Sequence, residues 1–280
     1  MLLDLLHRPA GHRCVPCRQV LSRHAVGGQG FRSFLKQTLL AIEGLTQRFG
    51  GVAALTDVSF SVDAHTIQAL IGPNGAGKTT LFNAITGFLR LDSGRVSFKG
   101  RRIDGMTPQR IARLGMVRSF QSIRMFKGLT VYESLLVSRP REHRWSVRAS
   151  QAKVGRMLER MRLADVADRI CSDLPLLAQR RVEVARALMT DPTMILLDEP
   201  SAGATVPERH ALVELIAELK AAGTTVMVIE HNVPFVMQVS DRMVVLDFGK
   251  KVADGTPVEI AGNPIVREIY LGSNEEQGGA

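Results

Sequence analysis

The chain has 280 residues, 45% of them hydrophobic, so it can bury a sizeable core and is neither a disordered nor a collagen-like polypeptide. Lys and Arg (36) outnumber Asp and Glu (27), giving a net charge of +9, but residues 1–38 alone carry +5 of this excess and the remainder is only mildly basic. Three cysteines cannot form a disulfide framework, which favours a reducing compartment, and no apolar run approaches the roughly 18 residues of a membrane span.

Residues 1–38 show no sustained hydrophobic period, and we predict a flexible basic extension there. Cys14 and Cys17, with His12 nearby, form one Cys-x-x-Cys pair without a second ligand pair, so a poorly ordered tail is favoured over a zinc site. The folded domain is predicted to span residues 39–272, and residues 273–280 are predicted to form a flexible tail.

The predicted elements begin with an edge strand over residues 39–49 and an alternating strand at Val58–Val62. From Ile67 the pattern becomes an apolar strand, a glycine loop and a helix, which indicates the start of a parallel α/β core. A mostly helical subdomain is expected over about 108–190. The alternation then resumes with strands at 193–200, 224–230 and 242–249, and a helix at 207–222.

The glycine loop that follows the first core strand matches the P-loop pattern GxxxxGK(S/T) between a strand and a helix. Its glycines allow backbone N–H groups to face phosphate oxygens, and the next helix adds its positive dipole end. Lys78 is expected to reach the β- and γ-phosphates, and the Thr79 hydroxyl is expected to bind Mg²⁺. The predicted nucleotide-binding residues are Gly72, Pro73, Asn74, Gly75, Ala76, Gly77, Lys78, Thr79 and Thr80.

Two carboxylates end the strand at 193–200. Because the P-loop opens at the same edge of the sheet, Asp198 is expected to hold Mg²⁺ through water, and Glu199 is placed to polarise the attacking water. Without the P-loop, such an Asp-Glu pair would be interpreted as a solvated strand end.

Over residues 39–272 the chain resembles the ATPases of ABC transporters. The resemblance implies an α/β fold with a P-loop NTPase core and mixed sheet, an N-terminal antiparallel β subdomain and an inserted helical subdomain. It also implies ATP and Mg²⁺ as cofactors, Phe49 as the aromatic residue that stacks on adenine, and Gln121 as the Q-loop glutamine that senses Mg²⁺ and faces the membrane subunit. His231 corresponds to the switch histidine at the γ-phosphate. The catalytic set is therefore Glu199, His231 and Gln121, and the metal set is Thr79, Gln121 and Asp198.

Three segments, at 118–137, 174–188 and 263–272, are similar to one branch, the larger ATP-binding subunit of branched-chain amino-acid importers. This branch implies permease subunits, a second ATPase in a heterodimer, an indirect role for a substrate-binding protein, no nucleic-acid partner, and a place on the cytoplasmic face of the plasma membrane. Lipopolysaccharide-export ATPases are an alternative, although they typically lack the Arg-Ser/Thr-Phe-Gln form of the Q-loop. An ABC protein acting on nucleic acid would normally need a second cassette or an added binding domain.

Three departures from the family pattern affect these expectations. The signature loop reads Leu-Pro-Leu-Leu-Ala-Gln at 174–179 and lacks the signature glycine, which leaves open a degenerate, weakly hydrolysing cassette. In the D-loop, Thr205 stands where Asp or Asn is usual. Before the P-loop strand, His65 and Thr66 replace a Gly-Glu turn, a change that we expect to be tolerated.

Overall fold

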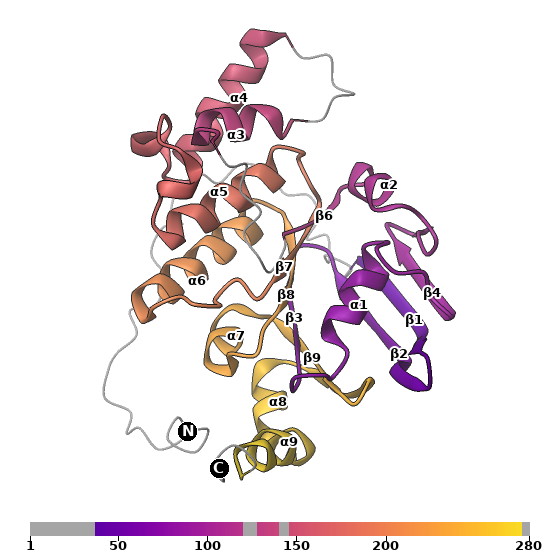
Figure 1. The fold of residues 1–280 in the computed structure, drawn as a ribbon. Coiled ribbons are helices and arrows are strands. Elements are labelled where there is room, and N and C mark those ends of the chain that lie inside the picture. Colours follow the sequence, from indigo (N-terminus) through magenta and orange to yellow (C-terminus); the bar gives the residue numbers. More distant parts are fainter. Residues whose placement is uncertain (1–36, 120–127, 140–145, 276–280) are drawn as a thin grey trace, which may run out of the picture. The chain divides into compact units, whose positions relative to one another are not determined.

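Two β-sheets organise the part of the chain that the computed structural model describes, which is residues 37–119, 128–139 and 146–275 (Figure 1). A four-stranded antiparallel sheet has the order β2-β1-β4-β5, and a six-stranded sheet has the order β10-β9-β3-β8-β7-β6. Its pairs β9-β3-β8-β7-β6 are parallel and β10-β9 is antiparallel. The predicted mixed sheet and N-terminal antiparallel β subdomain are thus confirmed. The strands are β1 Thr38–Phe49, β2 Val52–Asp63, β3 Ile67–Ile71, β4 Ser93–Phe98, β5 Arg101–Arg102, β6 Met116–Arg118, β7 Met194–Asp198, β8 Thr225–Ile229, β9 Arg242–Asp247 and β10 Lys250–Gly255.

Three of the described helices begin at a capping box. Thr130, Thr205 and Thr256 each precede a helix and pair with a glutamate three residues later, as capping boxes do. The helices are α1 Lys78–Ile85, α2 Pro108–Arg113, α3 Val131–Val137, α4 Val147–Arg160, α5 Leu176–Leu188, α6 Val206–Ala221, α7 Val233–Val239, α8 Pro257–Gly262 and α9 Pro264–Glu275, with short 3₁₀ turns at Ala164–Val166 and Cys171–Asp173. Among the described residues, no helix is both long and apolar enough to cross a membrane.

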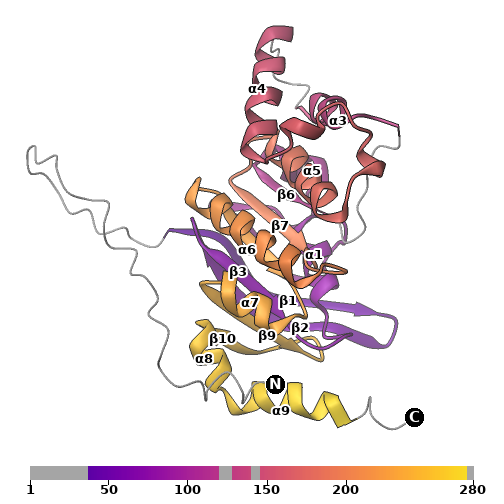
Figure 2. The same ribbon diagram turned by 90° about the vertical axis from the view of Figure 1, so that its left-hand side faces the viewer.

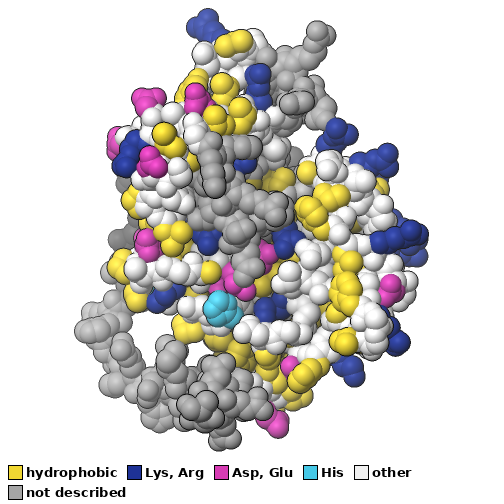
Figure 3. Space-filling view, in the orientation of Figure 1, with side chains coloured by type: hydrophobic (Ala, Val, Ile, Leu, Met, Phe, Trp, Pro, Cys, Tyr) yellow, Lys and Arg dark blue, Asp and Glu magenta, His cyan; other side chains and the backbone are white. Residues whose placement is uncertain are grey.

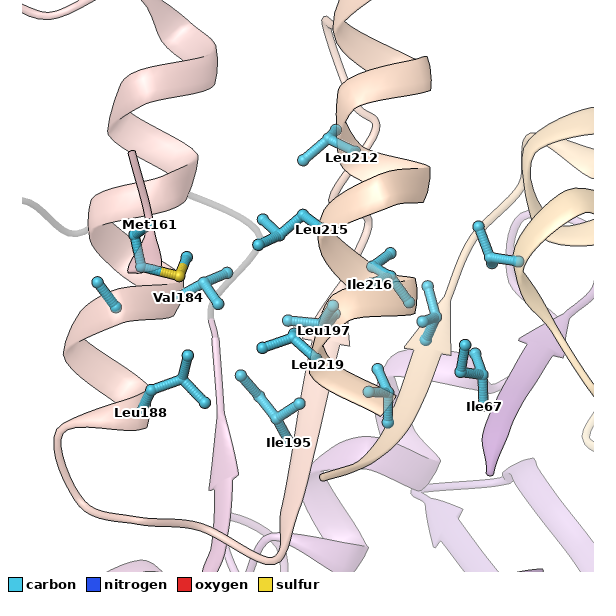
Figure 4. Packing of buried hydrophobic residues seen from close by; sticks show 14 of the residues in the cluster. Ile67, Met161, Val184, Leu188, Ile195, Leu197, Leu212, Leu215, Ile216 and Leu219 are labelled. Carbon is cyan, nitrogen blue, oxygen red and sulfur yellow. The ribbon is translucent and has the colours of Figure 1, made fainter. Parts of the chain in front are cut away.

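The core strands are buried on both faces, and each face supplies a separate hydrophobic cluster. In β7, Ile195 and Leu197 pack in a cluster with side chains of α5 and α6, whereas Met194 and Leu196 pack in a cluster with side chains of α1 and the antiparallel sheet. Figure 4 shows the first cluster, where side chains of α5 and α6 meet above β7. In Figure 2, α6 and α7 cover that face of the six-stranded sheet. This two-sided burial explains why the strands have continuous apolar sequences.

Four strands, β4, β5, β6 and β10, were not predicted from the sequence pattern. The segment predicted to be mostly helical contains β6, whose three residues pair in parallel with β7, from Met116 opposite Met194 to Arg118 opposite Leu196. Ser119 N–H continues the ladder by donating to Leu196 O at 2.9 Å. A three-residue strand is too short to show a period, and only the long-range pairing reveals it.

Basic side chains gather over β4, β5 and α2, at the right of Figure 3. The exposed members of this group are Arg95, Lys99, Arg101, Arg102, Arg110 and Arg113. The contacts of the chain divide it into Met1–Leu35 and Lys36–Ala280, and the described residues lie in the second unit. The predicted basic extension, with Cys14 and Cys17, lies outside the described residues.

Candidate nucleotide site

The P-loop joins β3 to α1 in a conformation that requires its glycines. Gly72 has φ 155°, and a Cβ there would meet Leu246 O at 2.2 Å; Gly77 has φ 97°, and a Cβ there would meet Ala54 O at 2.5 Å. A side chain at either position would therefore collide with backbone of β9 or β2. The predicted loop thus lies at the carboxyl end of a central strand, with backbone amides leading into the first turn of α1.

Lys78 is buried at the first position of α1, directly below the loop. Its Nζ atom donates to Gly72 O at 2.7 Å and to Pro73 O at 2.8 Å. Burial lowers the pKa of Lys78 from its ordinary value, and the charges of Glu199 and Asp198 act in the opposite direction. The exposed Thr79 follows Lys78, so the ammonium and the hydroxyl expected to contact phosphate and metal are adjacent in the chain.

The register of β7 and β8 places the acidic residues together. Asp198 lies opposite Ile229, so the next residues, Glu199 and Glu230, leave the carboxyl ends of neighbouring parallel strands. Glu199 has φ 47°, a left-handed conformation that is unusual for a glutamate, and its N–H donates to Ile229 O at 3.0 Å. Such backbone strain costs about 1–3 kcal/mol and is typical of functional sites.

His231 lies next to Glu199, as a residue acting on the same phosphate would. Its Nδ1 is 3.9 Å from Glu199 Oε1, and its side chain is 57% exposed, so it is accessible to a ligand. The structure therefore brings together three predicted groups, Lys78, Glu199 and His231, with Asp198 beside them.

Glu230 is a site residue that the sequence interpretation did not assign. Its side chain is 0% exposed, and Oε1 accepts the Ser201 N–H at 2.7 Å. Oε2 accepts the N–H groups of His231 at 3.2 Å and Asn232 at 3.4 Å. One buried carboxylate therefore joins the loop after Glu199 to the loop that carries His231.

Arg118 is the second unassigned residue at this site. Its guanidinium forms an ion pair with Asp198, Nη2 to Oδ2 at 2.5 Å, and donates from Nη1 to Asn83 Oδ1 at 2.6 Å. The guanidinium also lies 5.5 Å from the centre of the Phe82 ring. The sequence signal was the Arg-Ser-Phe-Gln motif itself, in which only the glutamine received a role.

One aromatic residue that was predicted to stack on adenine ends β1, and a second one interacts with the P-loop. Phe49 ends β1 and is 51% exposed, opposite Val52 in the hairpin register, as expected of a side chain that stacks on a base. Tyr270 on α9 reaches the P-loop from the carboxyl-terminal side. Burial raises the pKa of Tyr270, and hydrogen bonding with the Gly72 backbone acts in the opposite direction. The segment at 263–272, which is similar to the importer branch, contains this residue and could have identified it.

The signature segment starts α5, with Pro175 at the N-cap and no side-chain cap hydrogen bond. Leu177 is half-buried and packs against the hydrophobic core, so its side chain is part of the packing of α5. Thr205 caps α6, and both its N–H and its hydroxyl donate to Glu208 Oε2 at 2.8 Å. Gln121 lies outside the described residues.

The replaced turn before β3 is accommodated by side-chain bonds. His65 adopts φ 61°, a conformation that glycine takes more easily, and its ring Nδ1 is 2.7 Å from Gly223 O. Thr66 Oγ1 donates to Asp63 O at 2.7 Å.

The donor set fits Mg²⁺. Asp198 and Thr79 offer oxygen ligands, and the described residues contain no group of three or more His, Cys, Asp or Glu side chains that could hold a metal without help. Mg²⁺ is usually bound by one or two protein oxygens together with phosphates and waters, which matches this arrangement.

A nucleotide-phosphate loop, a carboxylate pair and a histidine on one sheet edge define a P-loop ATPase of the ABC type, and comparisons with known proteins agree. The ABC transporter family model matches residues 55–202, and the chain belongs to this family. A second model, described as branched-chain amino acid ATP-binding cassette transporter, matches residues 250–276. The chain is therefore an ATPase with an ABC cassette of the branched-chain amino acid type.

Similar proteins and structures support this assignment over most of the chain. The high-affinity branched-chain amino acid transport ATP-binding protein LivG of Salmonella typhimurium is 42% identical and aligns with 85% of this chain and 99% of its own length. BraF of Pseudomonas aeruginosa, with the same description, is 40% identical over 85% of this chain and 99% of its own. A crystal structure of a nucleotide-free ATP-binding cassette from an ABC transporter is 35% identical, with TM-score 0.76, and the match covers 84% of this chain and 99% of that one.

Proposed function

We propose that this chain binds ATP with Mg²⁺ and uses its hydrolysis to drive permeases that import branched-chain amino acids or related amides. The observation that carries the proposal is the convergence of Lys78, Asp198, Glu199 and His231 at one edge of the sheet. The names of the relatives described above support the substrate class. They do not favour the lipopolysaccharide-export alternative.

The site performs phosphoryl transfer mainly by positioning and electrostatics. The P-loop amides and Lys78 neutralise charge on the phosphates, while Asp198 and Thr79 hold Mg²⁺, which supplies further charge neutralisation when bound. Glu199 orients the attacking water and accepts its proton, and the nearby His231 donates a hydrogen bond to the γ-phosphate. Gln121 senses the metal from the Q-loop, and Phe49 stacks on adenine.

A groove is lined in part by Arg118 and Ser119, shortly before the Q-loop glutamine that is expected to face the membrane subunit. It has a volume of about 610 Å³ and lies between α2, β6 and the ends of α1, α3 and α5. Phe88 and Val137 on its lining are exposed apolar residues. We propose that a short permease helix docks there and holds this chain at the cytoplasmic face of the membrane, where a substrate-binding protein acts only through the permease. No nucleic-acid partner is proposed.

The signature segment favours a heterodimer with a second ATPase. In an ABC sandwich each ATP lies between the P-loop of one subunit and the signature loop of the other, so Pro175 and Leu177 act on the partner's nucleotide. Pro175 has neither hydroxyl nor N–H to donate, and Leu177 adds bulk where glycine lets the backbone approach phosphate. A homodimer would carry two impaired sites and would correspond to the degenerate, weakly hydrolysing alternative.

The test compares Glu199→Gln with the equivalent substitution in the partner ATPase, in the complex with permeases reconstituted in vesicles. We expect Glu199→Gln to retain ATP binding but to abolish most ATP hydrolysis and leucine uptake, because its site faces an intact signature loop. Glu208→Gln, at an exposed helix cap, serves as the control. Equal loss from both subunits would contradict the asymmetry, and normal hydrolysis by Glu199→Gln would contradict the catalytic assignment.

A further inference from the structure

Arg118 is held at three points, each on a different part of the site. Its backbone belongs to β6, which is fixed beside β7 by parallel pairing. Its side chain extends from a position opposite Leu196 to the end of β7, where it meets the carboxylate of Asp198. Two residues of α1, Asn83 and Phe82, contact the same guanidinium at 2.6 Å and 5.5 Å.

This ion pair is almost entirely removed from solvent. The side chains of Arg118 and Asp198 are 8% and 4% exposed. A buried carboxylate is costly unless it is paired and hydrogen-bonded, and Arg118 supplies both an ion pair and a hydrogen bond to Asp198. The guanidinium fork also donates in two fixed directions, to Asp198 through Nη2 and to Asn83 through Nη1, which a single ammonium cannot reproduce.

The ion pair constrains the orientation of the Asp198 carboxylate. Oδ2 accepts the bond from Arg118 at 2.5 Å, and this bond restricts rotation of the carboxylate. A carboxylate that serves a metal is usually oriented by a hydrogen-bond partner of this kind, and loss of such a partner weakens metal binding by about 10- to 100-fold.

We propose that Arg118 is a positioning residue that orients Asp198 for Mg²⁺ and, through Asn83, locks this carboxylate to the helix that carries Lys78 and Thr79. This inference rests on the Mg²⁺ site of the proposed function. It assigns a role to the arginine of the Arg-Ser-Phe-Gln motif, separate from that of Gln121 three residues later.

The experiment measures the affinity of the purified chain for a fluorescent ATP analogue, with Mg²⁺ and with EDTA. The readout is the gain in affinity that Mg²⁺ produces, which requires no turnover. Arg118→Met should lose about 10- to 100-fold of this gain while its affinity in EDTA stays near that of the wild type. Arg118→Lys, which keeps the charge but not the fork, should recover part of the gain, and Asn83→Ala should show a smaller loss in the same direction.

Lys153→Met is the matched control. Lys153 on α4 is also a buried cation, with its side chain 10% exposed, but it pairs at 2.5 Å with Asp191, which is 73% exposed, and it lies away from the P-loop. It should change stability without changing the gain produced by Mg²⁺. Arg118→Lys and Asn83→Ala carry the same test if Arg118→Met does not fold.

The proposal is overturned if the Arg118 and Asn83 variants keep the full Mg²⁺ gain, or if they lose affinity equally in Mg²⁺ and in EDTA. The latter result would indicate a general structural role. If instead the wild type itself gains nothing from Mg²⁺, the proposed metal site fails, an outcome separate from loss of the Arg118 effect.

Discussion

Glu230→Gln provides a sharp test of the buried carboxylate that joins the loops of Ser201 and His231. The substitution changes one oxygen to an NH₂ group and leaves the size of the side chain almost unchanged. If the amide oxygen stays on Ser201 N–H, the new NH₂ faces the N–H groups of His231 and Asn232, which then lose their acceptor. If the amide flips, Ser201 N–H loses its 2.7 Å bond instead.

Either orientation leaves backbone donors unsatisfied, the buried N–H of Ser201 or the partly buried N–H groups of His231 and Asn232. Each costs about 1–3 kcal/mol, and bonds to a charged acceptor lie at the upper end, so we expect a loss on the order of 3 kcal/mol in the free energy of unfolding. That loss is a large part of the 5–15 kcal/mol by which a typical domain is stable. ATP hydrolysis should fall as well, because the backbone N–H of His231 loses its hydrogen bond to residue 230.

Urea unfolding followed by far-ultraviolet circular dichroism measures the stability, and phosphate release measures hydrolysis. Glu259→Gln is the control, because Glu259 also accepts a backbone N–H, from Thr256, but in an exposed capping box. Its effect should be clearly smaller. The reasoning is refuted if Glu230→Gln unfolds within about 0.5 kcal/mol of the wild type, which is the range of ordinary surface substitutions.

The remaining predictions concern the P-loop, the signature segment and the cysteine. Lys78→Ala should weaken ATP binding at least tenfold, because charge-assisted hydrogen bonds contribute about 1.5–3 kcal/mol. The control Lys250→Ala, at an exposed position, should leave the affinity unchanged. Equilibrium titration with ATP measures both affinities, and equal values for Lys78→Ala and the wild type would contradict the assignment. The double substitution Leu177→Gly with Ala178→Gln should raise ATP hydrolysis by the isolated chain. The increase should reach about a hundredfold if one hydrogen-bond donor to the phosphate, worth roughly 3 kcal/mol, is regained. An unchanged rate would count against the signature argument. Burial raises the pKa of Cys171, so less thiolate forms at neutral pH. Iodoacetamide should therefore modify Cys171 only after the chain unfolds. Rapid alkylation of the folded chain, detected by mass spectrometry, would disprove this prediction.

The sequence predicted the P-loop segment and the acidic strand ends, because these features depend on residues that are close together in the chain. The strand, glycine loop and lysine at residues 67–78 could be recognised because a P-loop needs these residue types at a fixed spacing, and the structure places them as expected. The carboxyl ends of β7 and β8 were recognisable for a similar reason, since apolar runs end there in charged residues.

The contacts that depend on tertiary pairing could not be predicted. Arg118 meets Asp198 only because β6 pairs with β7, and β6 is too short to show a period. Glu230 looked like the end of a strand, and nothing in its neighbours indicated that three N–H groups converge on it. Thr205 departs from the usual D-loop residue, but in the structure it is the N-cap of α6, where its hydroxyl and its N–H both donate to Glu208 Oε2.

The position of β3 in the sheet has a consequence for synthesis of the chain. β3 carries the P-loop, yet its two neighbours are β8 and β9, with Ile67 paired to Val226 and Ile71 to Val245. While the ribosome is still making the middle of the polypeptide, the P-loop strand has no partner on either side, and such long-range pairings form slowly. A chain whose synthesis stops before β9 should therefore lack an ordered P-loop. ATP can then bind only to chains that have been translated beyond β9.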